Sequence, residues 1–192
     1  MAMPDLSVDL TGKLLIAMPA MEDPRFAGAV VFVCAHAPSQ SMGLIVNKVM
    51  EDITFAEMME QLEISRRGAI PRVPVCFGGP VEMQRGFVLH SSDYRARGEE
   101  GMRIDHRFSM TGTLEILEDI AAAKGPHRAI LALGYAGWGE GQLDAEIQRN
   151  DWLTVDATPE LVFDLPMERK WNAAVESLGI NPLMLSSEAG HA

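Results

Sequence analysis

The most informative stretch of this chain reads Leu133-Gly134-Tyr135-Ala136-Gly137-Trp138-Gly139-Glu140-Gly141, and it continues as Gln142-Leu143-Asp144-Ala145-Glu146-Ile147-Gln148-Arg149-Asn150. An apolar run (residues 129–133) leads into the four glycines, and a helical pattern (residues 142–150) follows them. Glycine adopts conformations and permits close approaches that a Cβ would forbid, so this cluster predicts a loop of demanding geometry between a strand and a helix. Within that loop we expect Gly137 and Gly139 to be intolerant of any side chain.

A loop between a strand and a helix is also where phosphate-binding loops lie, because a helix N-terminus offers free backbone amides to an anion. The other requirements of such loops are not met. No Lys followed by Ser or Thr succeeds the glycines, and Gln142 stands where a dinucleotide fingerprint that begins at Gly137 and Gly139 would need a third glycine. Glu140, Asp144 and Glu146 would in addition repel an anion. The sequence therefore favours a structural turn.

The same stretch leaves a binding role open. Trp138 stands between two glycines, and its large ring with one polar N–H suits either a binding anchor or a cover over the core. As the alternative to a purely structural turn, Gly137, Trp138 and Gly139 are candidate contacts for a ligand or a partner protein.

Outside this stretch, short apolar runs and amphipathic segments alternate without a regular order. The predicted strands are residues 14–18, 29–35, 42–49, 73–77, 86–91, 129–133 and 152–155, with an alternating edge strand at 102–110. The predicted helices are residues 54–62, 114–123 and 142–150, one that begins at Thr158-Pro159, and one at 166–178. Hairpin-like pairs in the first half favour an α+β fold over a doubly wound sheet. We expect a single compact domain over residues 1–185 and a flexible tail over 186–192.

The helix at residues 54–62 has the clearest start signal. Thr54 and Glu57 form a capping box, in which each side chain accepts a hydrogen bond from the backbone amide of the other residue. Ile53 and Met58 occupy the positions of a hydrophobic staple. The sequence therefore predicts Thr54 as the N-cap.

The charge balance disfavours nucleic-acid binding. The 192 residues carry a formal net charge of −11, which repels a phosphate backbone. The densest basic region has five arginines between residues 82 and 107, but five carboxylates are interleaved with them. We therefore expect no direct binding of nucleic acid.

Cysteine usage and hydropathy indicate the compartment. Cys34 and Cys76 lie in apolar runs, and so sparse a pair is typical of a reducing environment rather than of a disulfide framework. The early apolar run at residues 14–18 is too short to span a membrane, and no basic segment precedes it as in a signal peptide. The sequence predicts a cytoplasmic protein that does not associate with membranes.

His36 and His90 each follow an apolar, strand-like run. If those strands were neighbours, the two imidazoles would converge, with Cys34 beside them as the nucleophile of a Cys–His pair. A histidine at a strand end, satisfied by backbone groups, is the simpler interpretation. The histidines and cysteines also lack the close spacing of metal ligands, so we expect neither a metal nor another cofactor.

Arg85 and Asn47 are two further candidates. Arg85 follows the turn Gly78-Gly79-Pro80 and is the arginine best placed to bind an anion, although an ion pair with Glu82 is the simpler interpretation. Asn47 interrupts an apolar run. We expect its amide to bond to neighbouring backbone groups, because a buried polar group left unpaired costs about 1–3 kcal/mol.

Four ordered motifs carry a resemblance to a known family. They are Gly12-Lys13-Leu14-Leu15-Ile16-Ala17-Met18-Pro19, then Met42-Gly43-Leu44-Ile45-Val46-Asn47, then Gly78-Gly79-Pro80-Val81 leading to Arg85-Gly86-Phe87-Val88-Leu89-His90, and finally the glycine stretch. In these motifs, and over nearly its whole length, the chain resembles the YqgE/AlgH family of bacterial proteins. The resemblance implies a mixed, mostly antiparallel sheet that curls into a partly closed barrel with helices packed outside. It also implies a role as a transcriptional regulator.

The chain departs from the family pattern around the first histidine. Ala35 stands where the family often has Glu, and Gln40-Ser41 stands where it commonly has Gly-Ala. Lys48-Val49 replaces the Arg-Pro that usually follows the asparagine. A Glu–His catalytic dyad on this segment is therefore not expected.

We interpret the chain as a non-enzymatic, cytosolic binding or regulatory protein that acts through a protein partner or a small ligand. The alternative is a ligand-binding protein or enzyme that uses His36, His90, Arg85 and the loop at residues 134–141. Geometry separates the two. Convergence of these elements on one open pocket favours the alternative, and their burial or dispersal favours the first interpretation.

The charge balance yields a testable prediction. The protein should not bind duplex DNA appreciably at physiological salt, because backbone affinity depends on Lys and Arg side chains that displace counterions. A fluorescence anisotropy titration with a random duplex would check this. Sub-micromolar binding that weakens with added salt would contradict it.

Overall fold

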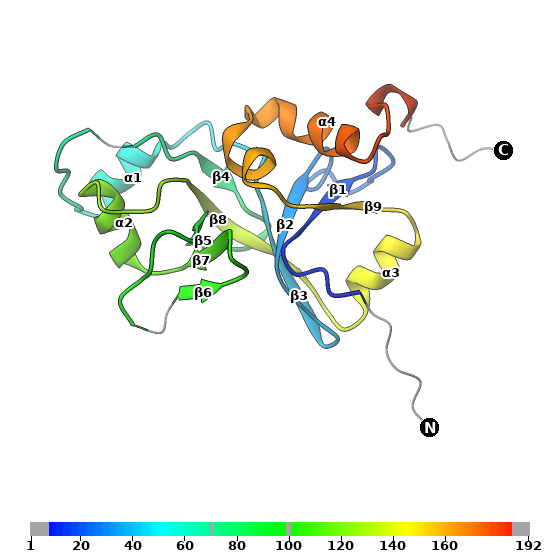
Figure 1. Ribbon diagram of the computed structural model, residues 1–192, viewed down its shortest axis with the longest axis horizontal. Coiled ribbons are helices and arrows are strands. Elements are labelled where there is room, and N and C mark those ends of the chain that lie inside the picture. The colour runs from blue at the N-terminus through cyan, green and yellow to red at the C-terminus, as the bar shows by residue number, and fades with distance from the viewer. Residues whose placement is uncertain (1–7, 70, 99–100, 186–192) are drawn as a thin grey trace.

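The chain folds around one long strand, β8 (Ala129–Trp138), that is shared by both halves of a curled sheet (Figure 1). The computed structural model describes residues 8–69, 71–98 and 101–185, and nine strands within them form this sheet. Their order is β6 (Gly101–Arg103), β7 (Phe108–Thr111), β5 (Val81–Ser91), β8, β3 (Gln40–Ile45), β2 (Val30–Ala37), β1 (Lys13–Ala17) and β9 (Trp152–Asp156). The remaining strand, β4 (Val75–Phe77), pairs with β8 in parallel, and all other pairings are antiparallel.

The sheet changes direction where β8 changes partners. Up to Leu133, β8 lies between β5 and β4, whereas from Ala136 onward it pairs with β3. Between these two halves, Gly134 has a φ of 74°, a left-handed conformation that glycine adopts at little cost. The neighbouring strand is irregular at the same level, since its pairing with β8 jumps from Val81 to Gly86.

A close approach of two backbone segments fixes this junction. A Cβ added to Gly79 would collide with the backbone of Tyr135, and one added to Gly134 would collide with the carbonyl oxygen of Gly79. Gly78 belongs to the same crossing, where its amide donates to Leu133 and its carbonyl accepts from Ile45. Glycine is therefore required at all three positions by contact, and at Gly79 and Gly134 also by a positive φ.

Alternation along the strands divides the hydrophobic core. On β1, Leu14 and Ile16 face the cluster inside the curl, whereas Leu15 and Ala17 face a second cluster on the outer side. A third cluster lies where the first helices cover β5 and β8. The arrangement is that of a single α+β domain with a curled, partly closed sheet and helices packed around it, as expected.

The helices occupy the ends and one side of the sheet. In Figure 1, α1 (Phe55–Gln61) and α2 (Leu114–Ala121) lie at one end, α3 (Gln142–Gln148) lies at the other, and α4 (Met167–Ser177) crosses near β1 and β9. A π-helix, η1 (Glu160–Asp164), precedes α4, and a 3₁₀-helix, η2 (Pro182–Met184), follows it. Among the described residues, no helix combines the length and the apolar character needed to cross a membrane.

The predicted capping box is present at α1. The Thr54 amide donates to the Glu57 carboxylate over 2.8 Å, and the Glu57 amide donates to the Thr54 hydroxyl over 3.2 Å. At the start of η1, Thr158 likewise accepts from the amide of Leu161 at 3.2 Å, although a five-residue π-helix follows it rather than an α-helix. The local signal therefore located the start of α1 correctly, whereas η1 begins at Glu160 with Pro159 at the N-cap, one residue later than expected.

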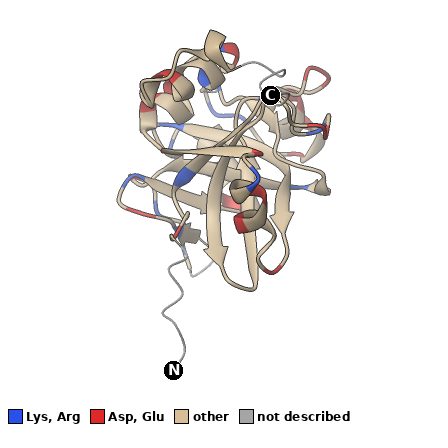
Figure 2. Cartoon of the chain, turned by 90° about the vertical axis from the view of Figure 1, so that its right-hand side faces the viewer, with Lys and Arg blue, Asp and Glu red and all other residues tan. Residues whose placement is uncertain are grey.

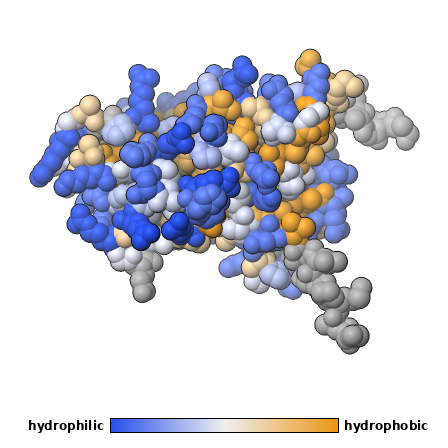
Figure 3. Space-filling view, in the orientation of Figure 1, coloured by the Kyte–Doolittle hydropathy of each residue, from blue (hydrophilic) through white to orange (hydrophobic). Residues whose placement is uncertain are grey.

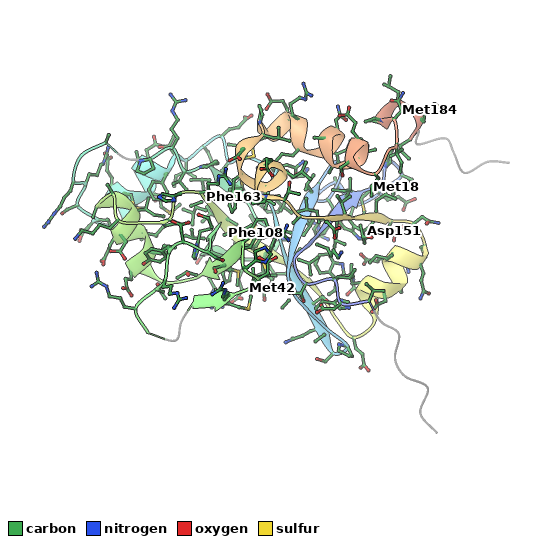
Figure 4. All side chains as sticks on the ribbon, in the orientation of Figure 1. Met18, Met42, Phe108, Asp151, Phe163 and Met184 are labelled. Carbon is green, nitrogen blue, oxygen red and sulfur yellow. The ribbon has the colours of Figure 1, made fainter. Side chains whose placement is uncertain are left out.

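Aromatic and lysine side chains hold the later helices against the inner face. Phe108 lies between Phe32 and Phe163, with ring centroids 4.9 and 5.7 Å away, and Figure 4 shows Phe108 and Phe163 close together at the centre of the molecule. The buried ammonium of Lys170 donates to the carbonyl oxygens of Val46, at 2.9 Å, and Val162, at 2.6 Å. Burial lowers the pKa of Lys170 to about 8. These contacts tie α4 and η1 to the strand end after β3.

Two sequence predictions are corrected. The expected edge strand at residues 102–110 is a hairpin of β6 and β7, because the Asp105 carboxylate accepts from the amides of Arg107 and Phe108 and closes a turn. The expected strand at residues 129–133 continues to Trp138, so most of the glycine stretch is strand rather than loop. Pairing with β3 extends it. The expected flexible tail at residues 186–192 lies outside the described residues.

The backbone crossing yields a prediction. Gly134→Ala should lower the free energy of unfolding by at least about 1–3 kcal/mol, because a side chain there strains the backbone and collides with Gly79. Gly137→Ala, on the same strand, should change it by less than about 1 kcal/mol. Chemical denaturation of both variants checks this, and equal losses would contradict it.

Candidate functional site

A carboxylate that holds two tryptophans organises the surface beside α3. The indole N–H groups of Trp138 and Trp152 both donate to Oε2 of Glu146, at 2.9 and 2.8 Å, and Gln142 donates to Oε1 at 2.9 Å. The two rings meet edge to face with centroids 6.2 Å apart. Strand β8, helix α3 and strand β9 are thereby joined through one side chain.

This carboxylate borders a surface cavity of about 300 Å³, which we call the aromatic hollow. Its walls come from the turn after β1, from the start of β5, from the end of β8 and from α3 and the start of β9. The lining residues include the aromatic and polar side chains of Phe26, Trp138, Gln142, Glu146 and Trp152, the turn residue Pro80, and the charged residues Asp23, Arg25 and Asp151.

A second and larger depression, of about 610 Å³, adjoins the aromatic hollow, and we call it the apolar groove. Its walls are mostly apolar side chains of β3, β5, β7 and β8. The principal lining residues are Met42, Arg85, Phe87, Met110 and Tyr135, with Ser41 at one side. The hollow and the groove share Val81, Gly137 and Trp138. Three of the four sequence motifs therefore meet at this surface.

Gly137 forms the saddle between the two depressions. It is exposed, and an added Cβ would meet only the Tyr135 ring at 3.4 Å and Val81 at 4.0 Å. An added Cβ at Gly139 would find its nearest neighbour, Gln142, at 3.9 Å. The expectation that these two glycines tolerate no side chain is therefore wrong, because the constrained positions are Gly79 and Gly134 instead.

Trp138 is both a cover and a wall. Its side chain is 5% exposed and packs in the outer core with Trp152, while part of its ring lines both depressions. The bond to Glu146 satisfies its only polar group. Trp138 therefore covers the core, as one interpretation of the sequence holds, and it also lines a surface where a ligand could bind, as the other holds.

Arg85 lies at the edge of the apolar groove. Its guanidinium is 4.9 Å from the centroid of the Phe87 ring and 3.7 Å from the Glu82 carboxylate, and its side chain is 58% exposed. The pairing with Glu82 is the simpler interpretation offered above. Because the pair is long and exposed, it leaves the guanidinium able to contact a ligand.

His36 lies on β2, directly across from Ser41, which lines the groove. Its Nδ1 is 3.0 Å from the hydroxyl oxygen of Ser41, its partner across β2 and β3, and its Nε2 is 4.0 Å from an oxygen of Asp144. Its side chain is 5% exposed. The Ser41 hydroxyl, the His36 imidazole and the Asp144 carboxylate thus lie in a row in space. The distance between His36 and Asp144 is too long for a hydrogen bond.

His90 lies elsewhere. Its strand, β5, is separated from β2 by β8 and β3, so the expected convergence of the two histidines is wrong. Nδ1 donates to the Ser91 carbonyl at 2.8 Å, and the Thr111 hydroxyl donates to Nε2 at 2.9 Å. The ring is 1% exposed and borders a different cavity of about 300 Å³ with Arg95 and Arg103. Burial lowers the pKa of His90, which keeps the ring neutral.

The Asn47 side chain is bonded to backbone groups at and just before the start of β2. Its side-chain oxygen accepts from the Val30 amide at 2.8 Å, and its nitrogen donates to the Gly28 carbonyl at 2.9 Å. These bonds continue the β2–β3 ladder after β3 has ended, which confirms the expected bonding to backbone.

The cysteines are buried and separate. Burial raises the pKa of both thiols, that of Cys76 to about 11, so neither is a ready nucleophile. Within residues 8–69, 71–98 and 101–185, no group of three His, Cys, Asp or Glu side chains is arranged to hold a metal ion.

Glu146 and Ser41 are site residues that the sequence did not indicate. From the sequence, Glu146 is only a charge that repels anions. Its spacing of four residues from Gln142 places both on one face of α3, which was an available signal. Its contacts with Trp138 and Trp152 depend on tertiary structure and had no local signal.

These observations define a single-domain α+β protein with a curled sheet and a two-part depression on its surface. The AlgH-like family model matches residues 14–183, and this chain belongs to the YqgE/AlgH family.

Relatives with similar sequences cover the whole chain. It is 78% identical over 192 residues to a UPF0301 protein of Jannaschia sp. (strain CCS1), with 100% of both chains covered. It is 56% identical to a UPF0301 protein of Ruegeria pomeroyi, over 96% of this chain and 100% of that relative.

Solved structures agree on the fold. The solution structure of the AlgH protein from Pseudomonas aeruginosa matches with a TM-score of 0.76 and 38% identity, over 100% of this chain and 99% of that one. A crystal structure of a Corynebacterium diphtheriae protein matches with a TM-score of 0.72 over 92% of each chain, at 22% identity, and so supports the fold alone.

Buried His90 yields a pH prediction. Its pKa is lowered in the folded protein, so the unfolded chain takes up the proton first as the pH falls below about 6.5. The His90 contribution to stability is therefore complete above that pH and is lost as the pH falls toward the folded pKa. Between pH 7 and 5, wild type should lose stability more steeply than His90→Gln in urea denaturation. The exposed His106→Gln should follow wild type, and identical slopes for all three would contradict the prediction.

Proposed function

We propose that this protein is a non-enzymatic binding protein whose contact surface is the saddle at Gly137 with the aromatic hollow and the apolar groove on either side. The candidate site residues that the sequence indicated fall into two groups, and only one of these groups lies at this surface. Arg85, Gly137 and Trp138 share the surface, whereas His90 and Asn47 are held in structural bonds away from it.

The observation that carries the proposal is the exposed glycine. Glycine weakens a strand interior, and it marks places where a ligand or another backbone comes close. The fold supplies no reason for glycine at position 137, because the backbone is extended and an added Cβ has room. A partner lying across the saddle would supply that reason.

We also propose a regulatory role for this surface. The family resemblance suggests transcriptional regulation, and the net charge of −11 disfavours direct contact with DNA. We therefore propose that the protein regulates through a bound protein or small ligand in the cytoplasm, where two unpaired cysteines remain reduced.

A second candidate function is hydrolytic. Ser41 lines the groove, its hydroxyl lies 3.0 Å from His36, and Asp144 stands behind the ring at 4.0 Å. This is the order of a nucleophile, a base and an orienting carboxylate. A fluorophosphonate probe would label wild type but not Ser41→Ala if this function were correct.

The experiment for the binding function is a comparative capture. Tagged wild type, Gly137→Val and Thr154→Val are incubated in native lysate, and the retained proteins and metabolites are identified by mass spectrometry. Thr154 is an exposed position on strand β9, outside both depressions, so its valine is a matched control. Gly137→Val should lose at least tenfold of a ligand or partner that the other two retain, because its side chain fills the saddle. Equal retention by three folded proteins would contradict the proposal.

A further inference from the structure

We propose that the aromatic hollow receives a cationic side chain, the guanidinium or ammonium group of an Arg or Lys on a partner protein. This inference rests on the binding function proposed above and names the chemistry of its partner.

The first step is the charge of Glu146. Its three hydrogen bonds come from two indoles and one amide, all of them neutral donors. Within the part of the chain that the structure describes, it forms no ion pair with Lys, Arg or His. A carboxylate offers about four acceptor sites, so one remains after these three bonds. Because the side chain is half-buried, water compensates its charge only in part, and a cation would complete the compensation.

The second step is the wall of the hollow. Phe26, Trp138 and Trp152 contribute aromatic surface, and aromatic rings attract cations. The hollow already shows this pattern, because Arg25, one of its lining residues, lies 5.8 Å from the Phe26 centroid. Asp23, which also lines the hollow, pairs with Arg25 at 2.6 Å and neutralises this cation.

The third step is the negative charge near the hollow. Asp23 and Asp151 line the hollow together with Glu146. Glu140 precedes α3 and Asp144 lies in its first turn, and Figure 2 shows acidic segments on this helix. Together with the net charge of −11, they produce a negative field that steers cations toward the hollow. Figure 3 shows hydrophobic atoms exposed on the side of the molecule that carries β9 and α3, so the charges stand beside apolar surface.

The shape favours a peptide over a free amine. The hollow continues across Gly137 into the apolar groove, which is about twice as large and is lined by Met42, Phe87 and Tyr135. A ligand that fills both parts has a basic group and a large apolar group a short distance apart. An extended peptide with a basic residue near a large apolar residue meets that requirement, and its backbone would lie over the glycine.

The test uses the tripeptide N-acetyl-Leu-Ala-Arg amide and its citrulline counterpart, which has nearly the same shape but no charge. The indole N–H signals of uniformly ¹⁵N-labelled protein report binding. The signals of Trp138 and Trp152 should shift saturably with the arginine peptide, and at least tenfold higher concentrations of the citrulline peptide should be needed. Trp171 is an internal control, because it does not line the hollow and its indole donates instead to the Ala17 carbonyl at 2.9 Å.

Two variants complete the test. Glu146→Gln keeps an acceptor oxygen for the indoles but removes the charge, so it should lose the preference for the arginine peptide. Glu118→Gln, on the exposed face of α2, removes the same charge elsewhere and should bind as wild type. Equal shifts with both peptides, no shift with either, or unchanged binding by Glu146→Gln would overturn the inference. If Gly137→Val still abolished partner capture in that case, the binding function would stand and its ligand would be neutral at this position.

Discussion

The curvature of the sheet follows from the contact between the backbone of Gly78 and Gly79 and that of Gly134 and Tyr135. No side chain separates the two segments, so β8 passes directly beneath the turn that joins β4 to β5. This contact lets one strand belong to both halves of the sheet, pairing first with β5 and β4 and then with β3. It also places the start of β5 beside the end of β8, which is where the two surface depressions meet.

The candidate site is built from structural side chains. Glu146 holds the two tryptophans that close the outer core, and the same carboxylate faces the hollow with its charge unpaired among the described residues. A residue that serves packing and binding together constrains both, since removing it would disturb the indoles as well as the charge. The isosteric change to glutamine separates the two roles, because it retains the acceptor and removes the charge.

The glycines of the most informative stretch have different tasks. Gly134 is required by its left-handed conformation and by contact with Gly79, whereas Gly137 is extended and open. The sequence does not distinguish these glycines, and it led us to expect the structural constraint at Gly137 and Gly139. The structure places that constraint at Gly134. A glycine that its own fold does not require is the better indicator of a partner.

The sequence by itself determined the features that depend on neighbours along the chain. The capping box at Thr54 and the bond from the Leu161 amide to Thr158 both follow from side chains within reach of amides three residues away. The hairpin-like pairs of apolar runs and the family motifs indicated the α+β class. Tertiary structure alone decided how far β8 extends, which strands separate His36 from His90, and how Glu146 meets Trp138 and Trp152. The physical reason is that strand pairing joins residues far apart in the chain, and its register carries no local signal where glycine replaces the alternating side chains.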